Sequence, residues 1–305
     1  MSAVDAAPAL VTLTAEHPVD PVATLSLLRH GDPCSRHDGA TLWWATRTPH
    51  GPATLHIARE PLCTVHARAW GEGAEWLLGR LPVLIGADRP PLDPLGNPVL
   101  RAAVGRQPGL RLPSTGVLVE SLLPAIVEQR VAGLAARRSW AALIRLLGDP
   151  APGPAGLLLP PDPARVAALE DWDLHRLNLE RQRGATLRRV ARRAAAIERL
   201  AGSDLPPEEV RARLVAELPG VGVWTAAEAT SRALGDEDAV SVGDYNLFKH
   251  VGFALIGRPA RDDAEMLRLL EPWSGRRGLA ALVLVSAVRM PRRGPRLPLR
   301  DFRHE

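Results

Sequence analysis

The spacing of hydrophobic residues changes along the chain near residue 112. Before that point, apolar and polar residues alternate over short runs separated by turn residues, which is typical of β-strands. The expected elements are a short helix over 22–29, a hairpin of strands 41–48 and 53–57, a third strand over 63–70, and a helix over 74–81. Residues 1–20 carry no periodic signal and are expected to form an arm or an edge strand. This mixture predicts an α+β N-terminal domain over residues 1–112.

After residue 112, apolar residues recur with the spacing of an amphipathic helix. The expected helices are 116–130, 131–147, 164–170, 173–179, 185–200, 207–217, 223–234, 245–255, 264–270 and 278–288. Glycine and proline interrupt the pattern over 148–154, where a loop within the helical region is expected. We therefore expect a mainly helical domain over 113–290, followed by a basic, proline-rich mobile tail over 291–305.

Composition narrows the class of protein. The chain has 305 residues, of which 46% are hydrophobic and 24% charged, enough to bury a core. Its two cysteines, Cys34 and Cys63, are too few for a four-cysteine zinc site or an iron–sulfur cluster. No stretch is long and apolar enough to span a bilayer, and the first residues are acidic where a signal peptide is basic. A soluble cytoplasmic protein is expected.

The net charge of the chain says little about its function. The formal net charge is +4, and Lys249 is the only lysine, so arginine supplies almost all positive charge. This balance is compatible with nucleic-acid binding, and equally with a bias in genome composition. The basic run over 181–199 is either a solvated helix face or a surface that follows DNA.

The most informative stretch joins the helices expected at 207–217 and 223–234. It reads Leu218-Pro219-Gly220-Val221-Gly222, and two glycines around one small apolar residue favour a tight hairpin. The second helix then begins with amide groups that have no partner within the helix, and such a terminus binds phosphate oxygens. The alternative is an αα-hairpin with only a packing role.

A second motif follows. Ser241-Val242-Gly243-Asp244-Tyr245 ends a loop and opens the helix expected over 245–255, which puts Asp244 at or near a helix N-terminus. The helix dipole stabilises an ionised carboxylate there. By itself this position indicates an ordinary N-cap.

The hairpin, the helix after it and the Gly-Asp-Tyr helix start, in that order, resemble the helix-hairpin-helix (HhH-GPD) superfamily of DNA glycosylases. The segments 108–113 and 122–131 and the tripeptide 271–273 resemble the AlkA-type 3-methyladenine DNA glycosylases II within it. The resemblance covers roughly residues 20–290. It implies an N-terminal α+β domain resembling half of a TATA-binding-protein saddle, then a two-lobed helical domain.

The resemblance also implies roles for individual residues. Asp244 matches the catalytic aspartate, and Arg130 falls where the family inserts a side chain into the gap left by a flipped nucleotide. Arginine at that position is able to stack as well as fill, or is a surface residue. The DNA-binding amides belong to Gly220, Gly222 and Thr225, and the carbonyls of Ala216, Leu218 and Val221 match those that hold Na⁺ or K⁺ when DNA is bound.

Two positions on the helix expected over 223–234 bear on the reaction. Trp224 stands where the lyase branch carries its Schiff-base lysine, and an indole cannot form an imine. The resemblance places Trp224 in the base pocket and implies a glycosylase without AP-lyase activity. Glu228 replaces a second aromatic residue of the AlkA type. It is expected to hydrogen-bond a base edge, to attract a cationic base, or to be a solvated helix residue.

The sequence thus predicts a monofunctional glycosylase of base excision repair that flips an alkylated purine from duplex DNA and hydrolyses its N-glycosidic bond. One alternative is a glycosylase for oxidised, deaminated or mismatched bases, which Glu228 makes plausible. Another is a non-catalytic DNA-binding protein, which has no need of Asp244. A monomer without a resident cofactor is expected.

Overall fold

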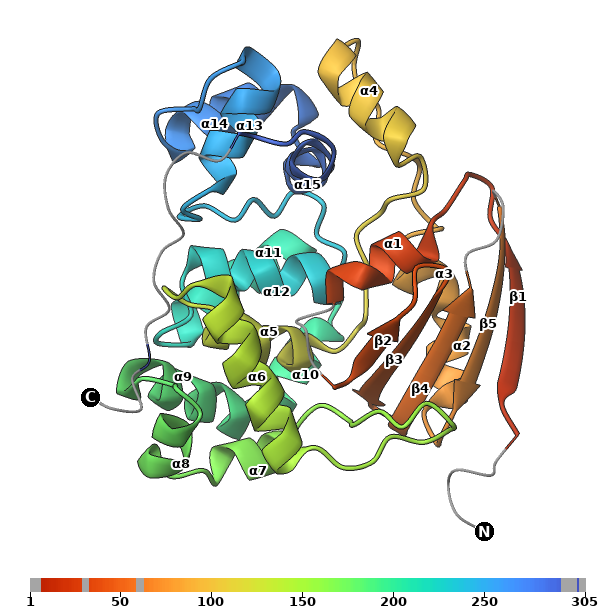
Figure 1. The fold of residues 1–305 in the computed structure, drawn as a ribbon, viewed down its shortest axis with the longest axis vertical. Helices are drawn as coiled ribbons and strands as arrows, with labels where there is room; N and C mark the ends of the chain where they lie inside the picture. The colour runs from red at the N-terminus through yellow and green to blue at the C-terminus, as the bar shows by residue number, and fades with distance from the viewer. Residues whose placement is uncertain (1–6, 29–32, 59–62, 292–300, 302–305) are drawn as a thin grey trace.

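A sheet and two groups of helices make up the molecule (Figure 1). The computed structural model describes residues 7–28, 33–58, 63–291 and 301. The tail expected over 291–305 therefore lies almost entirely outside the described residues. None of the helices within the described ranges is both long and apolar enough to cross a membrane.

The sheet is antiparallel, and within the described residues it has five strands in the order β1-β5-β4-β3-β2. The strands are β1 (Ala9–Thr14), β2 (Ser35–His37), β3 (Thr41–Thr48), β4 (Gly51–Ala58) and β5 (Thr64–Trp70). The expected hairpin is β3–β4, which closes where Thr48 pairs with Gly51. The N-terminal segment forms an edge strand, because β1 pairs only with β5. Strand β2 is an addition to the predicted set.

Short helices cover one face of the sheet. They are α1 (Pro21–Leu25), η1 (Ser26–Leu28), α2 (Ala74–Gly79) and α3 (Leu81–Leu84). Leu42, Leu55 and Ile57 of the sheet pack against Leu77 and Leu81 in a hydrophobic core that belongs to this layer alone. Alternation along β3 and β4 puts one apolar set on that face.

The larger group of helices forms a second core. Its members are α5 (Leu118–Val127), α6 (Gly133–Leu147), α7 (Pro163–Ala167), α8 (Asp171–Arg176), α9 (Arg181–Arg192), α10 (Ala194–Ala201), α11 (Pro207–Glu217) and α12 (Val223–Ala233). Helix α5 lies at the centre, because it packs against α12, α9, α10 and α6. Its residues 118–127 are almost entirely buried, including Pro124 inside the helix.

A third core joins distant parts of the chain. It combines α13 (Leu247–Ile256), α14 (Asp263–Leu270), η2 (Glu271–Trp273) and α15 (Arg277–Ala287) with α4 (Pro98–Arg106). Helix α4 lies beside α15, although it comes from the segment that leads out of the sheet (Figure 1). Leu100 and Leu110 thus share a core with C-terminal helices. The domain boundary at residue 112, the half-saddle and the two lobes remain predictions.

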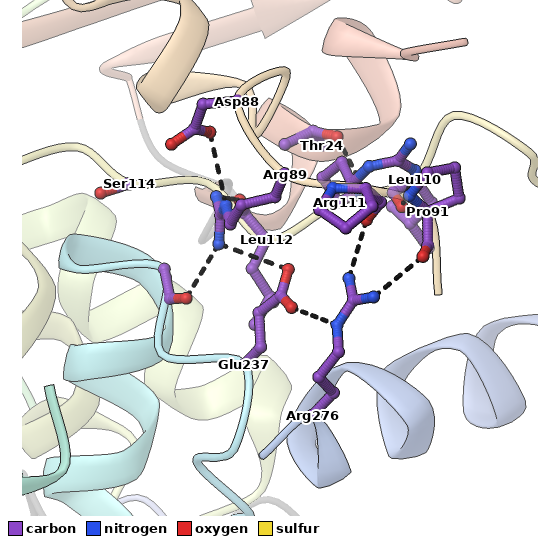
Figure 2. A network of polar contacts seen from close by, with 12 residues as sticks. Thr24, Asp88, Arg89, Pro91, Leu110, Arg111, Leu112, Ser114, Glu237 and Arg276 are labelled. Atoms are coloured by element: carbon purple, nitrogen blue, oxygen red, sulfur yellow. Dashed lines mark hydrogen bonds and ion pairs between the residues drawn. The ribbon is translucent and has the colours of Figure 1, made fainter. Parts of the chain in front are cut away.

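A polar junction fixes the third core against the chain that leaves the sheet (Figure 2). Glu237 accepts hydrogen bonds from Arg276 and, at 3.4 Å, from Arg89. Arg89 also donates to the carbonyls of Gly235 and Leu112, at 2.9 and 2.8 Å. The Glu237 side chain is only 10% exposed, so its charge is balanced by two guanidinium groups in a largely dry setting. This junction immediately precedes the loop that carries Asp244.

Candidate active site

The hairpin has the predicted geometry. Helix α11 ends at Glu217, α12 begins at Val223, and Gly220 between them has φ +93°. A Cβ on Gly220 would lie 2.2 Å from the Thr186 hydroxyl, so this position requires glycine. Gly222 is exposed and extended, and it offers no side chain to cap α12. The first amides of α12 therefore keep their capacity to bind an external acceptor.

Side chains from the turn after α5 and from the C-terminal part of α9 and its cap hold the hairpin. Gln129 donates through Nε2 to the carbonyl of Gly220, at 2.9 Å. Arg189 and Arg193 donate to the carbonyls of Pro219 and Glu217, each at 2.7 Å. Part of the basic run over 181–199 thus has a structural role, in addition to the solvated face or DNA surface expected from the sequence.

The carbonyls predicted to hold a monovalent cation alternate with those that the arginines occupy. Among the described residues, Leu218 O accepts only the turn hydrogen bond from Val221 N, at 2.9 Å. Arg189 and Arg193 take neighbouring carbonyls instead. Backbone carbonyl oxygens at an unwound helix end are suitable ligands for Na⁺ or K⁺. The carbonyl oxygens of Ala216, Leu218 and Val221 therefore fit the expected ion.

Asp244 divides its carboxylate between two tasks. Oδ1 accepts from the amides of Asn246 and Leu247, at 2.7 and 2.9 Å, and so caps α13. Helix α13 starts at Leu247, two residues later than predicted, because Asp244-Tyr245-Asn246 form this capping turn. Oδ2 has no hydrogen bond or ion pair with any residue that the structure describes. The group is half-buried, which leaves Oδ2 available to a ligand.

Two neighbouring groups hold the loop before Asp244. The amide of Asp244 donates to the carbonyl of Ser241 at 3.2 Å, and that of Gly243 donates to Asp263 Oδ2 at 2.9 Å. Gly243 has φ +90°, which a residue with a side chain adopts only with strain. The loop is thus tied to α14 through the carboxylate of Asp263.

Glu228 has two partners of its own. Its Oε2 forms an ion pair with Arg232 one turn later at 2.6 Å, and its Oε1 accepts from the Ser241 hydroxyl. The Glu228 side chain is 17% exposed, so it is not a solvated helix residue. The predicted possibility of a solvated Glu228 is therefore wrong.

Glu228, Arg232 and Ser241 are among the residues that line a cleft of about 140 Å³ between α12, α13 and α15. The lining also includes the apolar residues Leu27, Leu247 and Val285. Trp224 is half-buried one turn before Glu228 on α12, and neither it nor Asp244 lines this cleft. Asp244 lies on the backbone between two lining residues, Ser241 and Leu247. The structure thus brings Glu228 to the loop of Asp244, while Trp224 stands apart.

Arg130 follows the end of α5, in the turn before α6. Its side chain is exposed, and its φ of +55° is unusual for a residue with a side chain. The neighbouring Gln129 reaches the hairpin, so the turn and the hairpin are mechanically joined.

Gln129, Ser241 and Arg232 were not among the residues singled out from the sequence. Arg232 had a usable signal, because glutamate and arginine four positions apart on a helix pair readily. The partners of Gln129 are 91 and 96 positions away, so no local pattern reveals them.

Comparison with solved structures defines the class of fold. A 3-methyladenine DNA glycosylase from Archaeoglobus fulgidus matches with a TM-score of 0.73 and 18% identity, over 90% of this chain and 97% of that one. The 8-oxoguanine glycosylase/lyase of Clostridium acetobutylicum matches with a TM-score of 0.60 and 13% identity, over 83% and 98%. The chain therefore has the fold of the helix-hairpin-helix DNA glycosylases.

Relatives in sequence indicate which type of glycosylase the chain resembles. No family model matches the chain. The probable bifunctional transcriptional activator/DNA repair enzyme AlkA, from two strains of Mycobacterium tuberculosis, is 31% identical over 165 residues. The match covers 54% of this chain, which spans only 32% of the length of those relatives. The resemblance to AlkA-type glycosylases, predicted from the motifs, is confirmed.

Proposed function

We propose that this protein is a monofunctional DNA glycosylase that removes alkylated purines from duplex DNA. The observation that carries the proposal is that the two carboxylate oxygens of Asp244 differ in their hydrogen bonding. One oxygen caps α13 and fixes the group, and the other has no partner among the described residues. A purely structural N-cap leaves the same pattern, so the argument also needs the hairpin, whose bare amides provide a phosphate site on the preceding helix.

The hairpin is the proposed anchor for DNA. The N-terminus of α12 at Gly222 and Thr225 binds a backbone phosphate. The carbonyls of Ala216, Leu218 and Val221 would hold Na⁺ or K⁺ when DNA is bound, and the ion would supply further positive charge there. Arg130 is the proposed wedge. Its exposed side chain fills the space left by the flipped nucleotide and stacks on the remaining bases.

Hydrolysis begins with the target nucleotide rotated out of the stack, which costs a few kcal/mol. The bond between C1′ and the base nitrogen breaks, its electron pair leaves with the base, and positive charge develops on the sugar. The ionised Asp244 stabilises that charge and orients water toward C1′. The water oxygen then bonds to C1′, and the proton that the water loses passes to solvent. An alkylated purine is already cationic, so it leaves as a neutral base without a strong general acid.

The pocket residues support this substrate class. Trp224 is the proposed aromatic wall, since an indole face attracts a cationic base. Glu228 lies one turn further along α12, and its charge is balanced by Arg232 rather than free. Because Trp224 cannot form an imine, the proposed reaction ends at an abasic site without strand cleavage.

The proposed absence of strand cleavage rests on Trp224 and not on the fold, because a protein of similar fold is a glycosylase/lyase. Duplex DNA is the proposed partner, and a cytoplasmic monomer is the expected form, since a single chain can enclose one flipped nucleotide.

The deciding experiment is base release from methylated duplex DNA, with wild type beside Asp244→Asn and the released bases identified by mass. Methylated purines from wild type alone would support both the class and the role of Asp244. Near-normal turnover by Asp244→Asn would remove Asp244 from the mechanism. If wild type binds the methylated duplex but releases no base, duplexes with oxidised, deaminated or mismatched bases are tested next. No base release from those duplexes would favour a non-catalytic DNA-binding protein.

A further inference from the structure

Ser241 connects two groups that the proposed function treats separately. Its hydroxyl donates to Glu228 on α12, and its carbonyl accepts the amide of Asp244 at 3.2 Å. Glu228 is held in turn by Arg232, whose Nε also donates to the carbonyl of Leu27 at 3.2 Å. A continuous path therefore runs from α12 through Ser241 to the backbone of Asp244.

We propose that Glu228 is a positioning residue, which holds Asp244 in place through Ser241 rather than contacting the base. This inference rests on the proposed function. It assigns Ser241 and Glu228 to the alignment of the carboxylate with C1′, and it removes Glu228 from the groups that select the damaged base.

Both carboxylate oxygens of Glu228 already have partners, which supports this role. Oε2 is paired with a guanidinium and Oε1 accepts a hydroxyl, so the oxygens that would read a base edge are both engaged. Breaking either contact to admit a base would leave Arg232 or Ser241 without its partner in a part-buried setting, which is costly. A carboxylate only accepts, and therefore Ser241 must be the donor.

The same helix carries the phosphate site. Gly222 precedes α12 and Glu228 lies six residues further along, which places them about 9 Å apart at 1.5 Å per residue. Since α12 is a rigid helix, a duplex phosphate bound at its N-terminus is held at a fixed distance from the group that supports Asp244. The Ser241–Glu228 hydrogen bond thus sets the spacing between the DNA anchor and the carboxylate.

The Asp263 contact alone does not do this. It ties Gly243 to α14, which lies in the third core, whereas α12 belongs to the second. Ser241 is the described side chain through which the loop reaches α12 itself. Removing it leaves the loop attached to one core and free to shift against the helix that grips DNA.

The test uses Ser241→Ala, with Ser231→Ala as its matched control. Within the part of the chain that the structure describes, the Ser231 hydroxyl donates only to the main-chain carbonyl of Glu228 in α12, at 3.0 Å. For base release from the substrate that wild type accepts, we expect Ser241→Ala to lower kcat roughly ten- to hundred-fold, as a small misplacement does. KM, DNA affinity and Tm should stay close to wild type, and Ser241→Thr should restore most of kcat.

Glu228→Ala provides the second arm. If Glu228 acts through Ser241, the double variant should be no slower than the slower single variant, because one shared contact is lost once. A kcat for Ser241→Ala within twofold of wild type overturns the inference, as does an effect confined to KM. Additive losses in the double variant also overturn it.

Hydrogen exchange separates this inference from the proposed function. Amides of residues 240–247 should exchange faster in Ser241→Ala than in wild type or Ser231→Ala, whatever reaction the protein performs. Unchanged exchange there overturns the positioning role. A wild type that releases no base from any duplex instead overturns the proposed function, and the exchange result still stands.

Discussion

The side-chain amide of Gln129 donates to the hydroxyl of Thr225 across 2.8 Å. Gln129 ends the turn after α5, next to the exposed Arg130, and Thr225 lies in the first turn of α12. The same amide group donates to the carbonyl of Gly220. One side chain therefore fixes the turn of the proposed wedge against the hairpin of the proposed phosphate site.

Gln129→Ala should weaken duplex binding by roughly three- to tenfold, because two hydrogen bonds of about 0.5–1.5 kcal/mol each no longer hold the hairpin. Fluorescence anisotropy with a labelled duplex measures the change in Kd. Gln182→Ala is the matched control, since Gln182 is exposed on α9 and its side chain has no contact with the hairpin among the described residues. Equal Kd values for the two variants would contradict the bracing role.

The two hairpin glycines should respond differently to alanine. Gly220 has φ +93° and its Cβ would meet the Thr186 hydroxyl, so Gly220→Ala should cost on the order of 1–3 kcal/mol of folding free energy. Gly222 has φ −93° and nothing within 4 Å of its Cβ, so Gly222→Ala should fold normally. Thermal unfolding distinguishes them.

The readout for Gly222→Ala is DNA affinity. The added methyl group projects into the open space where a phosphate is expected to approach, so duplex binding should weaken while Tm stays unchanged. A variant that binds as wild type does would move the phosphate site away from Gly222.

The buried carboxyl group of Glu120 should make the stability of the folded protein depend on pH. Its carboxyl group joins α5 to the sheet, accepting from the Thr46 hydroxyl at 2.7 Å and the Arg47 amide at 2.6 Å. Burial raises the pKa of Glu120 to about 8 from 4.5, although both hydrogen bonds lower it, and the nearby Glu198 raises it further. Between these values the folded state keeps a proton that the unfolded state has lost.

Stability should therefore fall as pH rises from about 5 to 8, by up to about 1.4 kcal/mol per pH unit for one proton. Above the folded pKa this contribution has been lost and the slope should vanish. Glu120→Gln should flatten the slope, because its amide cannot ionise. Urea unfolding across this pH range measures both proteins, and parallel curves would show that Glu120 is not responsible.

Local patterns were sufficient for part of this fold. Alternation predicted β3 and β4, and the glycine spacing predicted the hairpin at 218–222, because each depends on neighbouring residues. Helix α4 was missed because only Leu100 and Ala103 are buried, too short a signal to stand out. Strand β2 was missed because its polar residues 35–37 form a strand only by pairing with β3.

Local patterns likewise revealed some residues of the candidate site and not others. Asp244 was identified from the motif around it, but its capping turn delayed the start of α13, which periodicity does not show. The contact of Ser241 with Glu228 spans 13 positions and depends on how the loop folds back on α12. Sequence patterns found the groups that are proposed to act on a substrate, whereas the groups that are proposed to position them required the tertiary structure.

The absence of lyase chemistry is the last prediction. The resemblance to the glycosylase superfamily aligns Trp224 with the Schiff-base lysine of the lyase branch, and Lys249 is the only lysine in the sequence. The ammonium group of Lys249 lies 3.4 Å from the centre of the Tyr245 ring, and this cation–π contact holds it against the ring. Because Lys249 is held there and an indole cannot form an imine, wild type with abasic duplex DNA and borohydride should give neither a trapped adduct nor strand cleavage. The glycosylase/lyase of similar fold is the positive control. An adduct that disappears in Lys249→Arg would show that Lys249 leaves the ring and attacks C1′, and the proposed reaction would then have to include a lyase step.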